Sequence, residues 1–116
     1  MISNEYLKGT LKTIVLHLLA ENTRMYGYEI TQQVEKLSEG KIQLTWGALY
    51  PTLHKLEADG YIISEEYNIG KRVRKYYRLT PEGDKASNEK VAEFAEFVRI
   101  MKQILKPSPG LNLNYG

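Results

Sequence analysis

The sequence contains no cysteine, and this absence excludes several kinds of site at once. Without a thiol, the chain forms neither a disulfide nor a zinc site with thiolate ligands. Its two histidines, His17 and His54, fall in separate predicted helices, and no glycine-rich phosphate loop is present. A nucleophile and a base are therefore not placed together. We predict a protein that is not an enzyme and that uses no cofactor or metal.

The sequence also lacks a long apolar run and a strong excess of one charge. Its longest apolar stretch is broken by His17 and is far shorter than a membrane span. Residues 1–6 are polar and do not begin a secretory signal peptide. We therefore expect a cytoplasmic protein without a membrane partner. The formal net charge is only +2, so the overall charge hardly favours nucleic acid over other partners.

The distribution of the charge is more informative than its sum. Between Ile69 and Leu79 there is no acid, and five of the sixteen basic residues lie there: Lys71, Arg72, Arg74, Lys75 and Arg78. A local cluster of cations is typical of a surface that contacts DNA phosphates. The alternative is a solvated edge strand that its charges protect from aggregation.

Residues 45–60 form the segment around which the chain is organised. Leu49, Leu53 and Leu56 follow the spacing i, i+4 and i+7, which predicts a helix with one apolar stripe. The opposite face carries no acid and consists of Gly47, Pro51, His54 and Lys55, with Tyr50 at its edge. Such a helix can lie in a DNA major groove, although an ordinary surface helix shows the same pattern. Asp59-Gly60 ends it.

The neighbouring segments predict a winged helix-turn-helix. Two more amphipathic helices are expected, one around Leu7, Leu11, Ile14, Val15, Leu18 and Leu19, and one around Tyr26, Ile30, Val34 and Leu37. A short link, residues 41–44, joins the second of these to the segment above. Strands at 61–67 and 73–79, with a turn at 68–70, then form a hairpin whose tip and return strand hold the cations.

The last predicted helix has a repeating apolar pattern. Thr80 is a preferred N-cap and Pro81 a preferred first residue. The apolar residues then step by three and four: Val91, Phe94, Val98, Met101 and Leu105. Phe97 and Ile104 form a second stripe, with Ile100 further round. Two stripes at the edge of so small a domain predict a two-fold dimer through this helix. The alternative is one wide face buried within a monomer.

Together these elements predict a mainly α (α+β) fold. We expect a winged helix-turn-helix with a two-stranded wing and a long C-terminal dimerisation helix. Residues 1–80 are assigned to the DNA-binding domain and residues 81–106 to the dimerisation helix. Pro107-Ser108-Pro109-Gly110 stops that helix, so residues 107–116 are predicted to form a flexible tail.

Four segments resemble the PadR family of bacterial transcriptional regulators. They are LKGTL at 7–11, YGYEI at 26–30, GALYPTLHKLE at 47–57 and KYYRLTPEG at 75–83. Together they run in near-continuous register, and four motifs in the family's order make the resemblance specific. The single final helix is similar to the compact subfamily. The resemblance implies a homodimeric repressor that binds a palindromic operator in double-stranded DNA and is released by a signal, often a small phenolic or hydrophobic effector.

The resemblance also assigns residues. The predicted DNA-binding residues are Tyr28, Tyr50, Pro51, His54, Lys55, Lys71, Arg72, Arg74 and Lys75. Tyr76 and Tyr77 are expected to pack within the return strand. Some compact members clamp planar drugs with a tryptophan of the final helix, whereas the only tryptophan here is Trp46. The final helix offers Phe94 and Phe97 instead, which we retain as a candidate effector cleft.

A winged-helix protein-interaction module is the second interpretation. Such modules keep the fold but usually lose the basic wing, so the five cations count against it.

Overall fold

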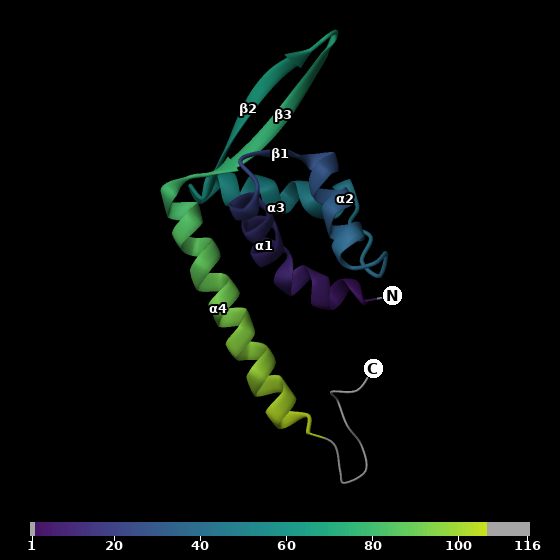
Figure 1. Ribbon diagram of the computed structural model, residues 1–116, viewed down its shortest axis with the longest axis vertical. Helices are drawn as coiled ribbons and strands as arrows, with labels where there is room; N and C mark the ends of the chain where they lie inside the picture. The colour runs from purple at the N-terminus through teal and green to yellow at the C-terminus, as the bar shows by residue number, and fades with distance from the viewer. Residues whose placement is uncertain (1, 107–116) are drawn as a thin grey trace.

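The computed structural model describes residues 2–106, which form four helices and a three-stranded sheet (Figure 1). The elements are α1 (Asn4–Glu21), β1 (Met25–Tyr26), α2 (Gly27–Leu37), α3 (Trp46–Ala58), β2 (Ile62–Ile69), β3 (Arg72–Leu79) and α4 (Pro81–Ile104). The predicted winged helix-turn-helix fold is confirmed. The tail predicted at 107–116 lies outside the described residues. No helix within 2–106 has the length and apolar character needed to cross a membrane.

Helix α1 supplies the centre of the core. It begins after Ser3, whose Oγ accepts a hydrogen bond from the Glu5 amide at 3.2 Å, and it continues through Gly9 without a break. Its apolar face is buried against α3, β3 and the first part of α4, and consists of Leu7, Leu11, Val15, Leu16, Leu18 and Leu19. This packing holds α3, the base of the hairpin and α4 in one body, and α2 joins that body through α3 and the sheet.

The start of α2 differs from the prediction. Met25 and Tyr26 form a short strand that pairs with Tyr77 and Tyr76 of β3, so the helix begins only at Gly27. A strand of two residues has no periodicity by which the sequence could reveal it. Leu37 also differs, because it was placed in the buried stripe but is 66% exposed. It is the last residue of α2 and lies beyond the packed core.

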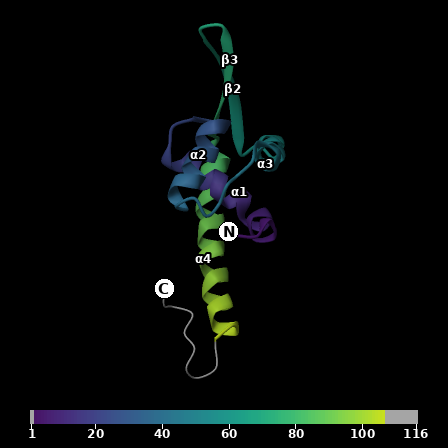
Figure 2. The ribbon, with the colours of Figure 1, turned by 90° about the vertical axis from the view of Figure 1, so that its right-hand side faces the viewer.

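The wing is longer than predicted. Strands β2 and β3 pair in continuous register from Ile62 opposite Leu79 to Ile69 opposite Arg72. The turn therefore consists of Gly70 and Lys71 alone, not of residues 68–70. Gly70 has φ +63°, which glycine adopts readily and which suits the first position of a two-residue hairpin turn. Figures 1 and 2 both show the hairpin projecting from the body on the side opposite to α4.

Helix α4 is fixed at its first turn. The Thr80 hydroxyl donates to the Gly60 carbonyl at 2.7 Å and accepts from the Gly83 amide at 3.0 Å, as its predicted N-cap role requires. Gly83 passes so close to Tyr61 that a Cβ there would overlap the Tyr61 carbonyl. The helix ends at Ile104, two residues before the predicted boundary at 106, and Leu105 is its C-cap.

Candidate nucleic-acid interface

Helix α3 has the two predicted faces. Thr45 caps it through a hydrogen bond from the Ala48 amide to its hydroxyl at 3.2 Å. Leu49, Leu53 and Leu56 are fully buried, because they pack against α1, α2 and β2. The four residues predicted to read DNA all lie on the exposed side: Tyr50, Pro51, His54 and Lys55. Lys55 Nζ is 3.7 Å from a carboxylate oxygen of Asp59, one turn further along the helix.

Three rings form a row along the exposed side of α3. The ring centroids of Trp46 and Tyr50 are 5.3 Å apart, and those of Tyr50 and His54 are 6.3 Å apart. The sequence prediction did not include Trp46 in this surface. The spacing 46, 50, 54 is i, i+4, i+8, which places all three side chains on one helical face, so the signal was present.

The start of α2 lies against this row. The six-membered ring of the Trp46 indole packs on Gly27, where a Cβ would overlap it. Tyr28, the predicted phosphate contact, follows Gly27 and is exposed. A shallow cleft of about 270 Å³ joins the start of α2, the start of α3 and strand β3, and its walls include Tyr28, Trp46, Tyr50, Val73 and Lys75. Three predicted DNA-contacting elements therefore meet at one place.

The cations of the wing differ in their surroundings. Lys71, Arg72 and Lys75 are exposed at the tip and along β3. Arg78 instead donates from Nε to Glu65 Oε1 at 2.6 Å, at the base of the hairpin. This hydrogen bond, together with a second from the Tyr67 hydroxyl, lowers the pKa of the Glu65 carboxyl. The sequence predicts one cluster of five cations, but in the structure one of the five, Arg78, forms an ion pair with Glu65.

Two arginines lie on aromatic rings of the sheet. The guanidinium carbon of Arg74 is 4.1 Å from the centroid of the Tyr26 ring. That of Arg24, which the sequence did not single out, is 4.4 Å from Tyr67 and 4.6 Å from Tyr76. The predicted packing role of Tyr76 and Tyr77 is confirmed, since Tyr77 is buried and Tyr76 meets Tyr26 edge to face. Burial is the main cause that raises the pKa of Tyr77.

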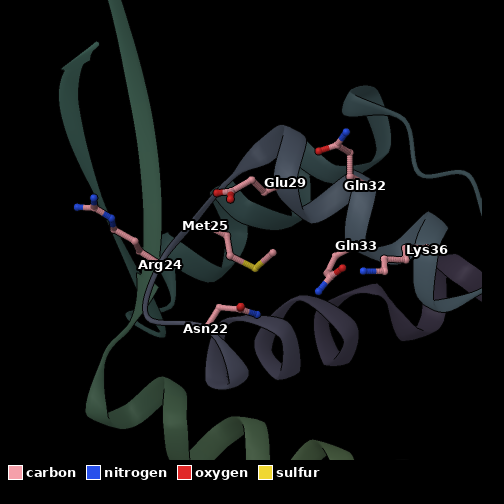
Figure 3. A pocket seen from close by; sticks show the side chains of 7 residues that line it. All are labelled: Asn22, Arg24, Met25, Glu29, Gln32, Gln33 and Lys36. Carbon is pink, nitrogen blue, oxygen red and sulfur yellow. The ribbon is translucent and has the colours of Figure 1, made fainter.

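A polar hollow of about 480 Å³ lies beside this region, between the end of α1, β1 and α2 (Figure 3). It is lined by Asn22, Arg24, Met25, Glu29, Gln32, Gln33 and Lys36, none of which was predicted to contact DNA. Glu29 already accepts a hydrogen bond from the Tyr26 amide at 3.0 Å, and Figure 3 shows Arg24 directed toward the wing. Within residues 2–106, no group of three acidic, histidine or cysteine side chains is placed to hold a metal.

The predicted dimerisation residues lie on a long, uncovered part of α4. Val91, Phe94 and Leu105 are exposed, and Val98 and Met101 are half-buried. Phe97, Ile100 and Ile104 of the second stripe are exposed as well. Phe94 and Phe97, the candidate effector residues, have ring centroids 6.2 Å apart and line a groove of about 810 Å³ between α4 and the start of α1. A single chain therefore buries neither apolar stripe.

Comparisons with known proteins agree with this geometry. Residues 15–89 match the model of the transcriptional regulator PadR-like family. The transcriptional regulator Rv3488 of Mycobacterium tuberculosis is 37% identical over 95 residues, which cover 82% of this chain and 85% of that protein. A transcriptional regulator from Clostridium thermocellum has a similar structure, with a TM-score of 0.81 and 31% identity over 90% of this chain and 99% of that one.

A PadR family regulator from Eggerthella lenta is also similar, with a TM-score of 0.75 and 33% identity over 90% of this chain and 88% of that one. The family match covers more than half of the chain and includes the helix-turn-helix, the wing and residues 81–89 of α4. The prediction of a regulator and not an enzyme is confirmed. This chain belongs to the PadR-like family of transcriptional regulators.

Proposed function

We propose that this regulator is a homodimeric repressor that binds a palindromic operator in double-stranded DNA. The observation that carries the proposal is the exposed face of α3, with Tyr50, His54 and Lys55, beside a hairpin whose tip is cationic. A helix that packs on the core through three buried leucines presents its other face to a major groove. The cations of the wing then contact the flanking phosphates. Because its target is chromosomal DNA, we place the protein in the cytoplasm of a bacterium.

The uncovered face of α4 supports the dimer. Apolar side chains along about four turns of helix are exposed to water in a single chain, and a second copy of the same helix would bury them. A two-fold axis between two such helices relates the two copies of α3. In helix-turn-helix dimers, the half-sites lie about 34–36 Å apart, so we expect an inverted repeat with centres about ten base pairs apart.

We also propose that a small effector releases the repressor from its operator. The groove between α1 and α4 is large enough for a drug-sized molecule and is lined by Phe94, Phe97 and Tyr6. A hydrophobic or phenolic molecule bound there would contact the dimerisation helix and the core helix together. Binding that favours one arrangement of these helices would change the separation of the two α3 helices and hence the affinity for the operator.

Selection from a random duplex library tests the function directly. The protein should enrich an inverted repeat, and its binding to that repeat should weaken steeply as salt rises, because phosphate contacts release counterions. A reporter gene behind the enriched repeat should be repressed. Lack of salt-dependent binding to any duplex would favour the second interpretation, a winged-helix module that contacts another protein. Enrichment of a single unpaired half-site would exclude the palindromic dimer but leave DNA binding intact.

A further inference from the structure

The row of rings on α3 begins one turn before the residues assigned to base reading. Trp46 is the first residue of α3 and is 51% exposed. The N-terminal residues of a recognition helix are those that reach base edges in helix-turn-helix complexes. Trp46 also contacts Tyr50, which is itself on the predicted reading surface. It is therefore placed to touch DNA, although the family motif does not single it out.

The Trp46 ring is held before any DNA arrives. Its six-membered ring lies on Gly27, and the absence of a side chain at that buried position is what leaves room for it. Tyr50 packs on Trp46 from the next turn of α3. A ring that is already ordered loses little conformational entropy on binding, so its contacts contribute more fully to affinity.

The cleft beside Trp46 is apolar at the surface. Its walls are formed mainly by the rings of Tyr28, Trp46 and Tyr50 and by Val73, which is exposed on the wing. The two cations at its edge lie over rings of the sheet, Arg74 over Tyr26 and Lys75 at 5.7 Å from the Tyr77 centroid. The lining therefore suits an apolar group better than a phosphate. On the major-groove edges of the base pairs, the apolar group is the 5-methyl of thymine.

We infer that Trp46 is a specificity-determining residue that, with Tyr28 and Tyr50, forms a site for the 5-methyl group of one thymine in each half-site. The inference rests on the proposed DNA-binding function and adds to it a chemical group that is recognised. Gly27 acts as a positioning residue in this site, because it seats the indole ring. The recognition surface thus extends from the middle of α3 to the start of α2.

Replacement of thymine by deoxyuridine tests the inference, since it removes the methyl group and keeps every hydrogen bond of the base pair. Each thymine of the duplex enriched by the selection above is replaced in turn, and affinity is measured by fluorescence anisotropy. At one position in each half-site, the replacement should lower the affinity of the wild-type protein about fourfold, which is the factor that burial of one methyl group contributes to binding. In Trp46→Ala the same replacement should leave the affinity unchanged, whereas in Lys85→Ala, an exposed position of α4, the loss should persist.

The outcomes separate this inference from the proposed function. If no uridine replacement weakens the wild type, or if the loss persists undiminished in Trp46→Ala, the thymine site is wrong while DNA binding stands. A library that yields no enriched duplex overturns both. If Trp46→Ala does not fold, the wild-type protein still tests the inference. Trp46 is its only tryptophan, so its fluorescence emission reports on this site alone. The thymine duplex should change the Trp46 emission more than the uridine duplex, and equal changes would overturn the site.

Discussion

Individual cations near the wing differ in what they are still able to contact. Arg78 is paired with Glu65, Arg74 lies over Tyr26, and Arg24 lies over two further tyrosines. Such contacts order these arginine side chains. They also leave fewer guanidinium N–H donors and fewer guanidinium faces free to contact a ligand. Lys71 and Arg72 at the tip are exposed. Charge counted along the sequence therefore overstates the charge available to DNA.

Replacing Glu65 with glutamine should remove an acid-sensitive contribution to stability. The hydrogen bond from Arg78, and after it that from Tyr67, lowers the pKa of Glu65 in the folded chain. A group whose pKa is lowered by folding stabilises the fold above its unfolded pKa, and this contribution disappears as pH falls through the folded pKa. The difference in Tm between wild type and Glu65→Gln should therefore be present at neutral pH and small, because the pair is exposed. It should vanish in acid; a difference that stays constant into acid would contradict the assignment.

Replacing Lys55 with alanine should relax the choice of base at one position of the operator. Lys55 lies on the exposed side of α3, where its ammonium can donate to guanine O6 or N7. We expect a loss of roughly 1–3 kcal/mol on the operator and a much smaller loss on random DNA. Titration against every single-base variant of one half-site measures this. A uniform loss at all positions would make Lys55 a phosphate contact, as expected instead for the control Lys71→Ala.

At the scale of elements, the wing and α3 are joined more closely than their separation in the sequence implies. The Ser64 hydroxyl of β2 donates to Glu57 Oε2 of α3 at 2.7 Å, and Tyr77 of β3 is buried against the core. Tyr26 of β1 packs edge to face on Tyr76 of β3. Strand β1 therefore supports the hairpin along the edge of β3 that does not pair with β2. The base of the wing is thereby fixed relative to the recognition helix, while the tip extends into solvent (Figure 1).

The wing tip should contribute affinity and little specificity. Lys71 lies in the turn and Arg72 begins β3, where both suit phosphate binding. Replacing both with alanine should weaken the binding of operator and of random DNA by similar factors. For every phosphate that the variant no longer neutralises, the slope of log affinity against log salt should fall by ~0.9. Titrations of both duplexes over a series of salt concentrations measure this slope.

The matched control for the wing changes the same charge elsewhere. Lys85→Ala with Lys102→Ala removes two exposed cations of α4 and should leave the salt slope nearly unchanged. An equal effect of both pairs would mean that only net charge matters. A loss confined to the operator in the wing variant would mean that the wing reads bases.

At the scale of the whole molecule, the shape separates the proposed DNA-contacting wing from the proposed dimer contact. Residues 2–106 measure 61 × 28 × 21 Å, with the wing at one end and the C-terminal part of α4 at the other (Figure 2). Gly83 and Thr80 fix the direction in which α4 leaves the domain, because they pack its first turn against Tyr61 and Gly60. The proposed dimer contact therefore sets the distance between two recognition helices without touching DNA.

Placing glutamates in the apolar face of α4 should separate the subunits. Val98→Glu with Met101→Glu would bring four carboxylates into the two-fold contact, and an unpaired buried charge costs roughly 3–5 kcal/mol. Sedimentation should show a dimer for the wild type and a monomer for the variant. Ala92→Glu with Gln103→Glu adds the same charge to the opposite face and should remain dimeric. A wild type that sediments as a monomer at tens of micromolar would exclude the proposed dimer.

Features that arise between residues a few positions apart could be predicted from the sequence. Leu49, Leu53 and Leu56 are buried as their spacing predicts, and Thr80 caps the helix that follows it. Capping bonds and helical periodicity join residues three or four positions apart, so they can be predicted without knowing the fold. The exposed face of α3 follows from the same geometry, as does the exposure of Tyr50, His54 and Lys55.

Contacts between distant residues became visible only in the folded chain. Met25–Tyr26 becomes a strand because β3 offers an edge for pairing, and Leu37 stays exposed because the core does not reach the end of α2. The contacts of Trp46 with Gly27 and of Arg24 with Tyr67 join residues of different elements, beyond the reach of helical or strand periodicity. Neither partner carries a local signal for the other, since packing between elements depends on how the whole chain closes around α1.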